Sequence, residues 1–456
     1  MNISHILAEF VSSVRAEALP EEIAGNVKLR ILDLLAAAAA GERLNDDMNR
    51  VMLKTLLQQG GEAQSSLLFQ RQKLSAAQAA FYNAFVVSGA EMDDGHMLAN
   101  GHPGVTTIPG VLALAQWRGC SWADVVAAIV AGYDVYIRLS NAVLPSHMQR
   151  GFYGTGTVGT IAAAAAAARV LGLDAEKTHV AIGLAAASAS GIMEFNESAQ
   201  EMKPINPANA AYKGVVCALM AENGAVAPDA PLDGKRGFFK AFADQADPSQ
   251  ITDGLGEVFL IDTSYIKLYP ACRHLHAMVD CGVQIRDSGR FNAENVEKIT
   301  LYTYPNSEKL TGAIRHPKNL VEAKFSLTYA ASMALLNGNF TLKDLDNWAQ
   351  IPEAAHTLID QMEIVVDPNL EIREKQIRGA RMEVLTKDGT GLTSAVDVPK
   401  GEKAFPLTDA DMRKKLAACA EGVLPQERCG KIFDMALNLE NVFDLETFFN
   451  LFMREG

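Results

Sequence analysis

Residues 160–171, TIAAAAAAARVL, contain seven consecutive alanines and place a small side chain on every face of a predicted helix. A helix that is apolar all round is buried, and one without bulky side chains can approach its neighbours closely. Apolar residues at helical spacing recur on both sides of this segment, up to about residue 265. We therefore predict that the first part of the chain is an all-helical bundle.

The helices predicted around this segment have clear start signals. Pro20 and two glutamates open one helix, and Ser75 and Ser121 are predicted N-caps of two others. A Gly-rich turn, GFYGTGTVG at residues 151–159, leads into the alanine-rich helix. The predicted helices cover residues 20–41, 48–59, 75–89, 105–117, 121–143, 160–171, 175–190 and 209–223.

The sequence pattern changes after about residue 265. Residues 296–304, VEKITLYTY, alternate branched, aromatic and polar side chains and predict a strand. Two further strand patterns flank KDGTG, which predicts a hairpin turned at Asp388 and Gly389. Helical patterns occupy residues 321–336, 342–350, 354–361, 408–419 and 426–452. We therefore predict a mostly α protein with a large all-helical domain, residues 1–265 with 405–456, and a smaller α+β domain, residues 266–404.

The composition limits the partners that we expect. The chain of 456 residues has 54 acidic and 41 basic side chains, a formal net charge of -13, and no run of Lys or Arg. Nucleic acids and anionic membranes bind to basic patches, so we expect neither as a partner. The longest apolar run, residues 161–170, is shorter than the roughly 20 residues that span a bilayer.

Cysteine usage and the N-terminal sequence predict a cytoplasmic location. The six cysteines form no C-x-x-C pair and no zinc spacing. Residues 1–20 lack the basic region and the cleavage site of a signal peptide and have the apolar spacing of an amphipathic helix. We therefore expect reduced thiols in a cytoplasm.

The first of two polar segments that can carry chemistry is EMDDGHMLANGHPG, residues 91–104. It contains two aspartates and two histidines, which are Asp93, Asp94, His96 and His102. These residues could bind a metal, form a solvated loop in which an aspartate caps the next helix, or form an active site with a base and its orienting partner. Their spacing matches no zinc motif such as H-E-x-x-H, and we expect no metal. His102 precedes a Pro-Gly turn that fixes its orientation, which favours the active-site interpretation.

The second polar segment is KLYPACRHLH, residues 267–276, with four cationic or titratable side chains: Lys267, Arg273, His274 and His276. An arginine fork binds a carboxylate through two hydrogen bonds, and a lysine adds a point charge. The alternative is structural, with Arg273 paired to an acidic side chain and His274 a satisfied interface histidine. Lys203, in a segment with prolines at 204 and 207, is either a further active-site cation or a surface charge. Together the two segments suggest a site where a small anionic substrate undergoes proton transfer.

These segments resemble, in the same order, motifs of the MmgE/PrpD family. The matching stretches are D-D-x-H...H-P-G, GFYGTGTVG, the lysine segment before ANAAYKG, KLYPACRHLH, and FSLTYAASMALL followed by the KDG hairpin. The family includes 2-methylcitrate dehydratase, cis-aconitate decarboxylase and iminodisuccinate epimerase. The resemblance implies a large helical domain interrupted by a smaller α+β lid domain, a cofactor-free active site in the cleft between them, and a homodimer. It places the family's acidic position at Asp93, its loop histidine at His102, its lysines at Lys203 and Lys267, and its later tyrosine at Tyr329.

Three departures from the family pattern bear on the reaction. Tyr153 and Gly154 stand where the decarboxylase and many relatives have histidine and proline, in GFHPTGT. The lysine segment continues with Pro-Ile-Asn instead of Arg-Leu-His, and Cys272 stands where the decarboxylase has a histidine. An epimerase needs only one proton-transfer group on each face of a carbon, and Tyr153, Lys203 or His102 can supply such groups.

We therefore predict an isomerase that epimerises an iminodisuccinate-type dicarboxylate without a cofactor, by removing a proton next to a carboxylate while cations stabilise the enolate-like charge. The alternatives are lyases, either a dehydratase of a 2-methylcitrate-like tricarboxylate or a cis-aconitate decarboxylase, and a non-catalytic binder of such acids. The predicted catalytic residues are His102, Tyr153, Lys203 and Asp93. The predicted substrate-binding residues are Lys267, Arg273, His274, His276, Tyr329 and His96.

Overall fold

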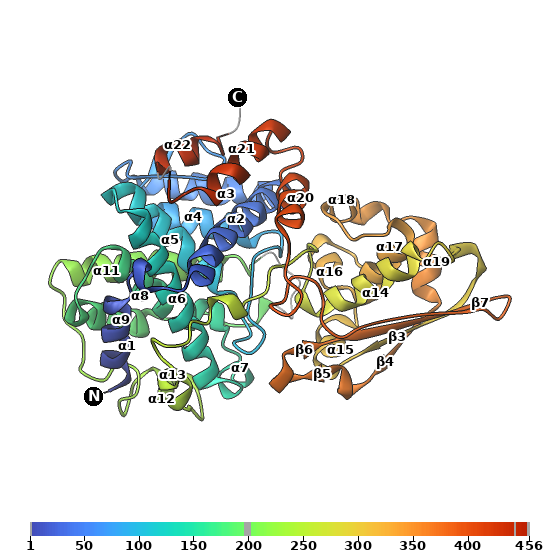
Figure 1. Cartoon of the computed structure of the whole chain (residues 1–456), viewed down its shortest axis with the longest axis horizontal. Helices are drawn as coiled ribbons and strands as arrows, with labels where there is room; N and C mark the ends of the chain where they lie inside the picture. Colours follow the sequence, from blue (N-terminus) through green and yellow to red (C-terminus); the bar gives the residue numbers. More distant parts are fainter. Residues whose placement is uncertain (1, 196–201, 442–443, 454–456) are drawn as a thin grey trace. The chain divides into compact units, whose positions relative to one another are not determined.

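The structure, a computed structural model, describes residues 2–195, 202–441 and 444–453 (Figure 1). The chain divides into two compact units, Met1–Tyr265 with Ala410–Gly456, and Ile266–Asp409. The chain passes from the first unit to the second after residue 265, the boundary that the sequence pattern predicted. It returns to the first unit after residue 409, beyond the predicted boundary at residue 404. The mostly α class that the sequence predicts, with a smaller α+β part, is confirmed.

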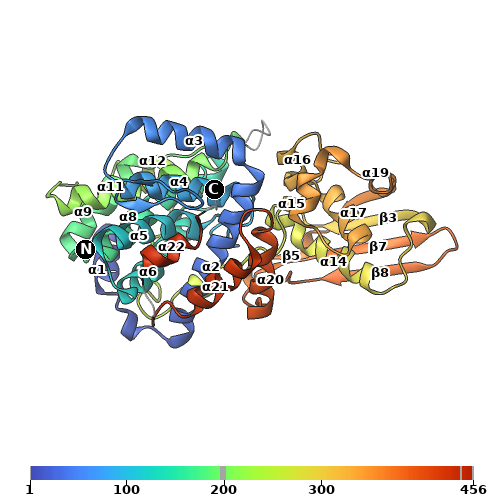
Figure 2. The same cartoon turned by 90° about the horizontal axis from the view of Figure 1, so that it is seen from above.

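The first unit is a bundle whose centre is α8 (Gly154–Val170). This helix packs against α5, α6, α9 and α11, and Figures 1 and 2 both show it among them. All residues from Ala162 to Ala168 are buried, as the alanine run predicts. The other helices of this unit are α1 (Ile3–Ser13), η1 (Ala16–Ala18), α2 (Glu21–Leu44), α3 (Asp46–Gln59), α4 (Ala76–Ser88), α5 (Pro103–Arg118), α6 (Trp122–Val143), α7 (Ser146–Gln149), α9 (Ala175–Ser188), α11 (Ile205–Glu222), α12 (Phe238–Phe242), α13 (Ser249–Thr252), η2 (Ile261–Thr263), α20 (Asp409–Cys419), α21 (Gln426–Leu437) and α22 (Leu445–Asn450).

The N-caps predicted at Ser75 and Ser121 are confirmed. Each serine side chain accepts a hydrogen bond from the backbone N–H three residues later, and Gln78 and Asp124 complete the two capping boxes. Two short antiparallel strands, β1 (Ser65–Ser66) and β2 (Lys73–Leu74), correct the prediction that this part of the chain is entirely helical. Strands this short have no alternation pattern that a sequence can show.

The start of α8 differs from the prediction. The glycines of residues 154–159 were expected to form a turn, and they instead form the first turns of the helix. Close packing explains the glycines, because a Cβ at Gly156 would lie 2.5 Å from the carbonyl oxygen of Ser190. A Cβ at Gly159 would similarly lie 2.7 Å from Cγ2 of Thr106. The small residues therefore allow neighbouring segments to approach the helix where it begins.

The second unit contains a four-stranded sheet in the order β4-β3-β7-β8. Its strands are β3 (Val296–Thr303), β4 (Met362–Val366), β7 (Ala380–Thr386) and β8 (Gly391–Val396). β7 pairs antiparallel with β3 and with β8, so the hairpin predicted at the KDG sequence is confirmed. β4 pairs parallel with β3 and was missed, because MEIVV carries too few alternating positions to stand out from the preceding helix. A separate pair of short strands is formed by β5 (Glu371–Ile372) and β6 (Ile377–Arg378).

Helices of the second unit pack on this sheet. α14 (His276–Asp287) contacts β7 and β8, and α17 (Leu327–Asn337) packs on α14. The helix predicted at residues 321–336 is two helices, because Ser326 leaves the helical conformation and caps α17 by accepting from the Tyr329 N–H. The remaining helices are η3 (Arg273–Leu275), η4 (Ala293–Asn295), α15 (Pro305–Thr311), α16 (Leu320–Phe325), α18 (Leu342–Asp346), η5 (Trp348–Gln350), α19 (Glu353–Asp360), η6 (Pro368–Leu370) and η7 (Arg373–Lys375).

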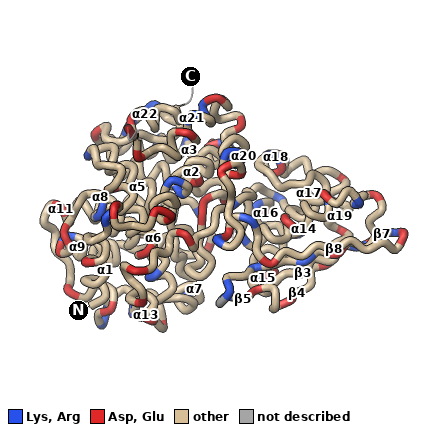
Figure 3. The backbone as a smooth tube through the Cα atoms, in the orientation of Figure 1, with Lys and Arg blue, Asp and Glu red and all other residues tan. Residues whose placement is uncertain are grey.

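Basic and acidic residues are interspersed along the backbone of each unit (Figure 3). Among the described residues, none of the helices combines the length and the apolar character needed to cross a membrane. The expected homodimer and cytoplasmic location stay predictions.

Candidate functional site

The polar loop of the first unit, residues 91–102, connects α4 to α5 and is fixed at both ends. His102 is the N-cap residue of α5 and is followed by Pro103 at the first helical position. Its backbone N–H lies 3.2 Å from the Tyr136 hydroxyl and 3.3 Å from Oγ1 of Thr155. Gly101 is required here, because a Cβ would lie 2.0 Å from the Tyr136 hydroxyl. The turn that was expected to orient His102 is therefore held by α6 and α8.

One nitrogen of the His102 imidazole, Nδ1, lies within reach of two hydrogen-bond acceptors. Nδ1 lies 2.7 Å from the backbone carbonyl of Asp94 and 3.1 Å from Oδ2 of Asp93. Both are oxygens that accept hydrogen bonds, so Nδ1 carries a proton whether the ring is neutral or charged. In the neutral ring Nε2 is then the nitrogen that can accept a proton, and the Asp93 carboxylate stabilises the cation that results.

Lys203, in the turn before α11, forms a buried ion pair with Glu91. Its side chain is 15% exposed, and burial lowers its pKa, while the Glu91 carboxylate, the strongest opposing influence, raises the pKa. Tyr153 and Asp93 act in the same direction, so the net pKa of Lys203 lies above its usual value. Lys203 is therefore an ammonium group that can donate a proton or stabilise negative charge.

Glu91 is held in an uncommon backbone conformation. Its φ is 57°, in the left-handed region that side-chain-bearing residues rarely adopt. Such a conformation persists only where its surroundings fix it, and it is often found at functional sites. Glu91, at the start of the loop, was not among the predicted site residues, because a single glutamate after a helix matches no motif.

Tyr153 is the N-cap residue of α8, and its backbone N–H lies 3.1 Å from the carbonyl oxygen of Gly191. Burial raises the pKa of Tyr153 to about 12, with the Lys203 ammonium opposing the rise and the Glu91 carboxylate supporting it. The side chain is therefore a neutral phenol next to a cation. The structure thus brings all four residues that were predicted to be catalytic into one cluster: Asp93, His102, Tyr153 and Lys203.

Asp94 and His96 hold the loop in place. The Asp94 carboxylate accepts from the Tyr133 hydroxyl at 2.7 Å and from the Gly104 N–H at 3.1 Å, and burial raises its pKa. Nδ1 of His96 accepts from the Ala99 N–H at 3.0 Å, so Nε2 carries the proton and donates to Oγ1 of Thr263 at 2.9 Å. Because both ring nitrogens are used inside the protein, the geometry favours a structural role for His96 over the predicted contact with substrate.

In the second unit, Arg273 is engaged by its own surroundings. Its guanidinium forms an ion pair with Glu402 at 2.8 Å and donates to Nδ1 of His276 at 3.0 Å. Nε2 of His276 lies 3.4 Å from the carbonyl oxygen of Ala271. The structural alternative for Arg273, pairing with an acidic side chain, is therefore present. Binding of a substrate carboxylate by Arg273 or His276 stays a prediction.

His274 is neutral and lies among cations. Its Nδ1 is 2.6 Å from the Tyr304 hydroxyl, and burial lowers its pKa far below the usual value. The positive charges of Arg378, Arg273 and Lys267 lower it further. The predicted substrate-binding residues at 267–276 are thus clustered, with Arg378 as a cation that sequence reasoning missed, because it stands far along the chain in a short strand.

The side chain of Tyr329 is hydrogen-bonded to a different segment of the second unit. Its hydroxyl donates to the carbonyl oxygen of Asp344 at 2.7 Å, and its ring packs edge-on against Phe340. The side chain is buried in the second unit. These contacts favour a packing role, and the predicted contact of Tyr329 with substrate stays a prediction.

Two domains of one family match almost the whole chain. The MmgE/PrpD N-terminal domain matches residues 5–251, and the MmgE/PrpD C-terminal domain matches residues 269–441. The chain belongs to the MmgE/PrpD family. The family resemblance that the sequence motifs indicated is therefore confirmed.

Several relatives of this MmgE/PrpD protein carry the name of one activity. A cis-aconitate decarboxylase-like protein, oryM, from Aspergillus oryzae is 24% identical over 97% of this chain and 96% of its own length. The cis-aconitate decarboxylase of Aspergillus terreus is 23% identical over 98% of this chain and 94% of its own length. The human cis-aconitate decarboxylase is 26% identical over 82% of this chain and 78% of its own length.

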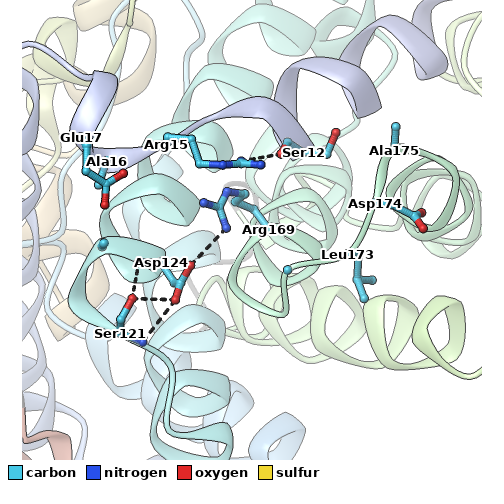
Figure 4. Close-up of a pocket in the computed structure, with 12 residues that line it drawn as sticks. Ser12, Arg15, Ala16, Glu17, Ser121, Asp124, Arg169, Leu173, Asp174 and Ala175 are labelled. Atoms are coloured by element: carbon cyan, nitrogen blue, oxygen red, sulfur yellow. Dashed lines mark hydrogen bonds and ion pairs between the residues drawn. The ribbon is translucent and has the colours of Figure 1, made fainter.

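The first unit of this MmgE/PrpD protein also has a surface pocket of about 630 Å³, which is lined by residues outside the cluster of Asp93, His102, Tyr153 and Lys203 (Figure 4). Its walls include Arg15 and Arg169, and also three acidic residues, Glu17, Asp124 and Asp174. Asp124 contacts Arg169, and Asp174 caps α9, so these charges serve local structure. None of the predicted site residues lines this pocket. Among the described residues, no group of three or more His, Cys, Asp or Glu side chains is placed to hold a metal ion.

Proposed function

We propose that this MmgE/PrpD protein is a cofactor-independent enzyme that transfers a proton at a carbon next to a carboxylate of a small polycarboxylic acid. The observation that carries the proposal is that one loop holds a member of each of two dyads, Asp93 paired with His102 of the same loop and Glu91 paired with Lys203 of the turn before α11. The first dyad presents a base at Nε2 of His102, and the second holds an acid at Nζ of Lys203. An acid and a base held together are what proton transfer to and from carbon requires.

The buried charges also suit an anionic intermediate. Removing a proton or CO2 from a carboxylic acid leaves negative charge on carbon and on the adjacent carboxylate. The Lys203 ammonium, which Glu91 keeps protonated, can stabilise that charge where water is largely excluded. Proton transfer by a positioned group typically contributes about 100- to 10,000-fold to a rate.

Decarboxylation of a cis-aconitate-type tricarboxylate is the first candidate reaction. The relatives named as cis-aconitate decarboxylases support it, since their similarity extends over most of both chains. In such a step one C–C bond to a carboxylate breaks and CO2 leaves. The electron pair stays on the carbon framework, and one proton from an enzyme acid completes the product. Lys203 is the group that we assign to deliver this proton.

Epimerisation of an iminodisuccinate-type dicarboxylate is the second candidate. It is supported by Tyr153, a neutral phenol beside the Lys203 ammonium, at a position where the family's decarboxylase has a histidine. With His102 as the base and Tyr153 or Lys203 as the acid, one proton leaves one face of a carbon and another arrives at the opposite face. A dehydratase of a 2-methylcitrate-like acid needs the same acid and base, with the acid protonating a departing hydroxide.

Product analysis by NMR tests the proposal. The purified protein is incubated separately with cis-aconitate, with 2-methylcitrate and with an aminodicarboxylate such as iminodisuccinate. Release of one CO2 per cis-aconitate consumed is the expected result. Interconversion of stereoisomers without an alkene would identify the epimerase, and water loss from 2-methylcitrate would identify the dehydratase. Line broadening of a ligand without any product would contradict the enzyme proposal and support a binding protein.

A further inference from the structure

Beneath the 91–102 loop lies a buried ion pair between Asp33 of α2 and Lys415 of α20. Both side chains are about 1% exposed. Burial raises the pKa of Asp33 to about 6, and the Lys415 ammonium opposes that rise. An ion pair removed this completely from water adds little to stability compared with packed apolar side chains, so its presence calls for another reason.

Lys415 also reaches the loop itself. Its Nζ donates a hydrogen bond of 3.0 Å to the backbone carbonyl oxygen of Met92. Met92 stands between Glu91, the partner of Lys203, and Asp93, the partner of His102. The orientation of the peptide between residues 92 and 93 therefore affects the side chains of both dyads. Lys415 is held against that peptide by Asp33.

The backbone around Met92 needs such support. Glu91 adopts a φ of 57°, which costs free energy for a residue with a Cβ. Farther along the loop, Gly95 and Tyr265 exchange backbone hydrogen bonds of 2.8 and 3.2 Å, and the Gly104 N–H donates to Asp94. These contacts hold the loop after residue 93. The Lys415 hydrogen bond acts at the strained start of the loop.

We propose that Lys415 and Asp33 are positioning residues that orient the Met92 carbonyl and thereby align Glu91 and Asp93 with Lys203 and His102. The proposal rests on the proposed proton-transfer function for its kinetic consequence. It assigns a role in the reaction to α20, which follows the second unit in the sequence and contains none of the predicted site residues. Neither Asp33 nor Lys415 touches the substrate in this account.

Two single variants, each of which removes one buried cation, test the proposal. Lys415→Met removes the hydrogen bond to Met92. Arg138→Met removes a cation that is likewise paired with an aspartate, Asp134. Arg138 donates to backbone carbonyls within residues 251–258 instead of to the carbonyl of Met92. We expect both variants to lower Tm. Only Lys415→Met is expected to lower kcat, by about 10- to 100-fold with KM changed less than about threefold, because misplaced catalytic groups slow the chemical step.

A double variant separates positioning from charge balance. Asp33→Leu combined with Lys415→Met removes both charges, so much of the lost Tm returns, but the donor to the Met92 carbonyl stays absent. We expect kcat to remain low in this variant. Recovery of kcat together with Tm would overturn the proposal, and so would a kcat for Lys415→Met equal to that of Arg138→Met.

Amide hydrogen exchange gives a result that does not depend on activity. In Lys415→Met the amides of residues 91–104 are expected to exchange at least about tenfold faster than in the wild type, and in Arg138→Met they are expected to stay unchanged. If no acid is turned over by the wild type, the proposed function fails while this exchange still tests the positioning. Unchanged exchange in Lys415→Met would contradict the inference even in an active enzyme.

Discussion

Nζ of Lys203 and the carboxylate of Glu91 form a largely buried ion pair although 112 residues separate them in the sequence. Glu91 contributes to this pair from a backbone in the left-handed region, and Lys203 contributes from the turn that starts α11. The pair keeps the lysine charged at a place where burial alone would favour the neutral amine. Glu91 therefore makes the main contribution to keeping Lys203 protonated, with Tyr153 and Asp93 acting in the same direction.

Replacing Glu91 with glutamine is expected to change the pH dependence of the reaction. Without the carboxylate, burial lowers the pKa of Lys203, so the proton-donating form is lost at a lower pH. We expect kcat/KM of Glu91→Gln to fall with rising pH between about pH 7 and 9, where the wild type stays level. Glu222→Gln is the control, since it removes the ion-pair partner of Arg118 at a partly exposed position. Profiles of Glu91→Gln and wild type that superimpose would contradict this role.

His102 and Asp93 are expected to have unequal effects. If the reaction removes a proton from carbon, His102→Gln removes the base and should lower kcat/KM by about 100-fold or more. Asp93→Asn should lower kcat/KM by a smaller factor. The Asp94 carbonyl still accepts from Nδ1 of His102 at 2.7 Å, so only the charge that stabilises the imidazolium is lost. Steady-state kinetics of the two variants measures the difference. A larger loss for Asp93→Asn than for His102→Gln would mean that the carboxylate itself transfers the proton.

Tyr153→Phe distinguishes the two candidate reactions. If Lys203 delivers the proton after decarboxylation, loss of the phenol hydroxyl should lower kcat by less than about tenfold. The ring that packs against Phe195 is retained, so the fold is not expected to change. A loss of about 100-fold in stereoisomer interconversion would instead assign proton transfer to Tyr153 and support the epimerase.

His147 is expected to make stability depend on pH. Burial lowers its pKa to about 4, and its Nε2 lies 2.8 Å from Oγ1 of Thr157. Because the folded-state pKa lies below the unfolded value, the neutral His147 contributes fully to the free energy of unfolding above about pH 6.5. This contribution is lost as the pH falls towards 4. Between pH 8 and 5 the contribution of His147 to the free energy of unfolding should fall by about 2 kcal/mol. Urea denaturation of wild type and His147→Gln at both pH values measures it, and equal losses in the two proteins would refute the assignment.

The helical bundle could be predicted because its signals are local. The alanines of residues 162–168 indicate burial on every side, and the serines at 75 and 121 cap helices by contacts within one turn. The parallel pairing of β4 with β3 depends on residues far apart in the chain, and no local pattern encodes it. The glycines of residues 154–159 misled the prediction for the same reason, since they are explained by the segments that pass close to α8.

The cluster of the first unit was predicted from motif residues, and its supporting charges were not. Asp93, His102, Tyr153 and Lys203 stood out because they lie in polar or Gly-rich segments that match a family. Asp33 and Lys415 stood in ordinary helical surroundings, where a charged residue is usually a surface residue, and Glu91 was a single glutamate that matches no motif. Only the folded chain shows that these three side chains are buried.

Deuterium incorporation tests the central claim, proton transfer to carbon by the cluster of His102 and Lys203, most directly. Wild type, His102→Gln and Lys203→Met are incubated in deuterated water with the acid that the wild type turns over, and NMR follows deuterium at the carbon next to the carboxylate. We expect one deuterium at that carbon in the wild-type product and a rate of incorporation lowered by about 100-fold or more in Lys203→Met, with His102→Gln also impaired. Incorporation at the wild-type rate in both variants would contradict the claim.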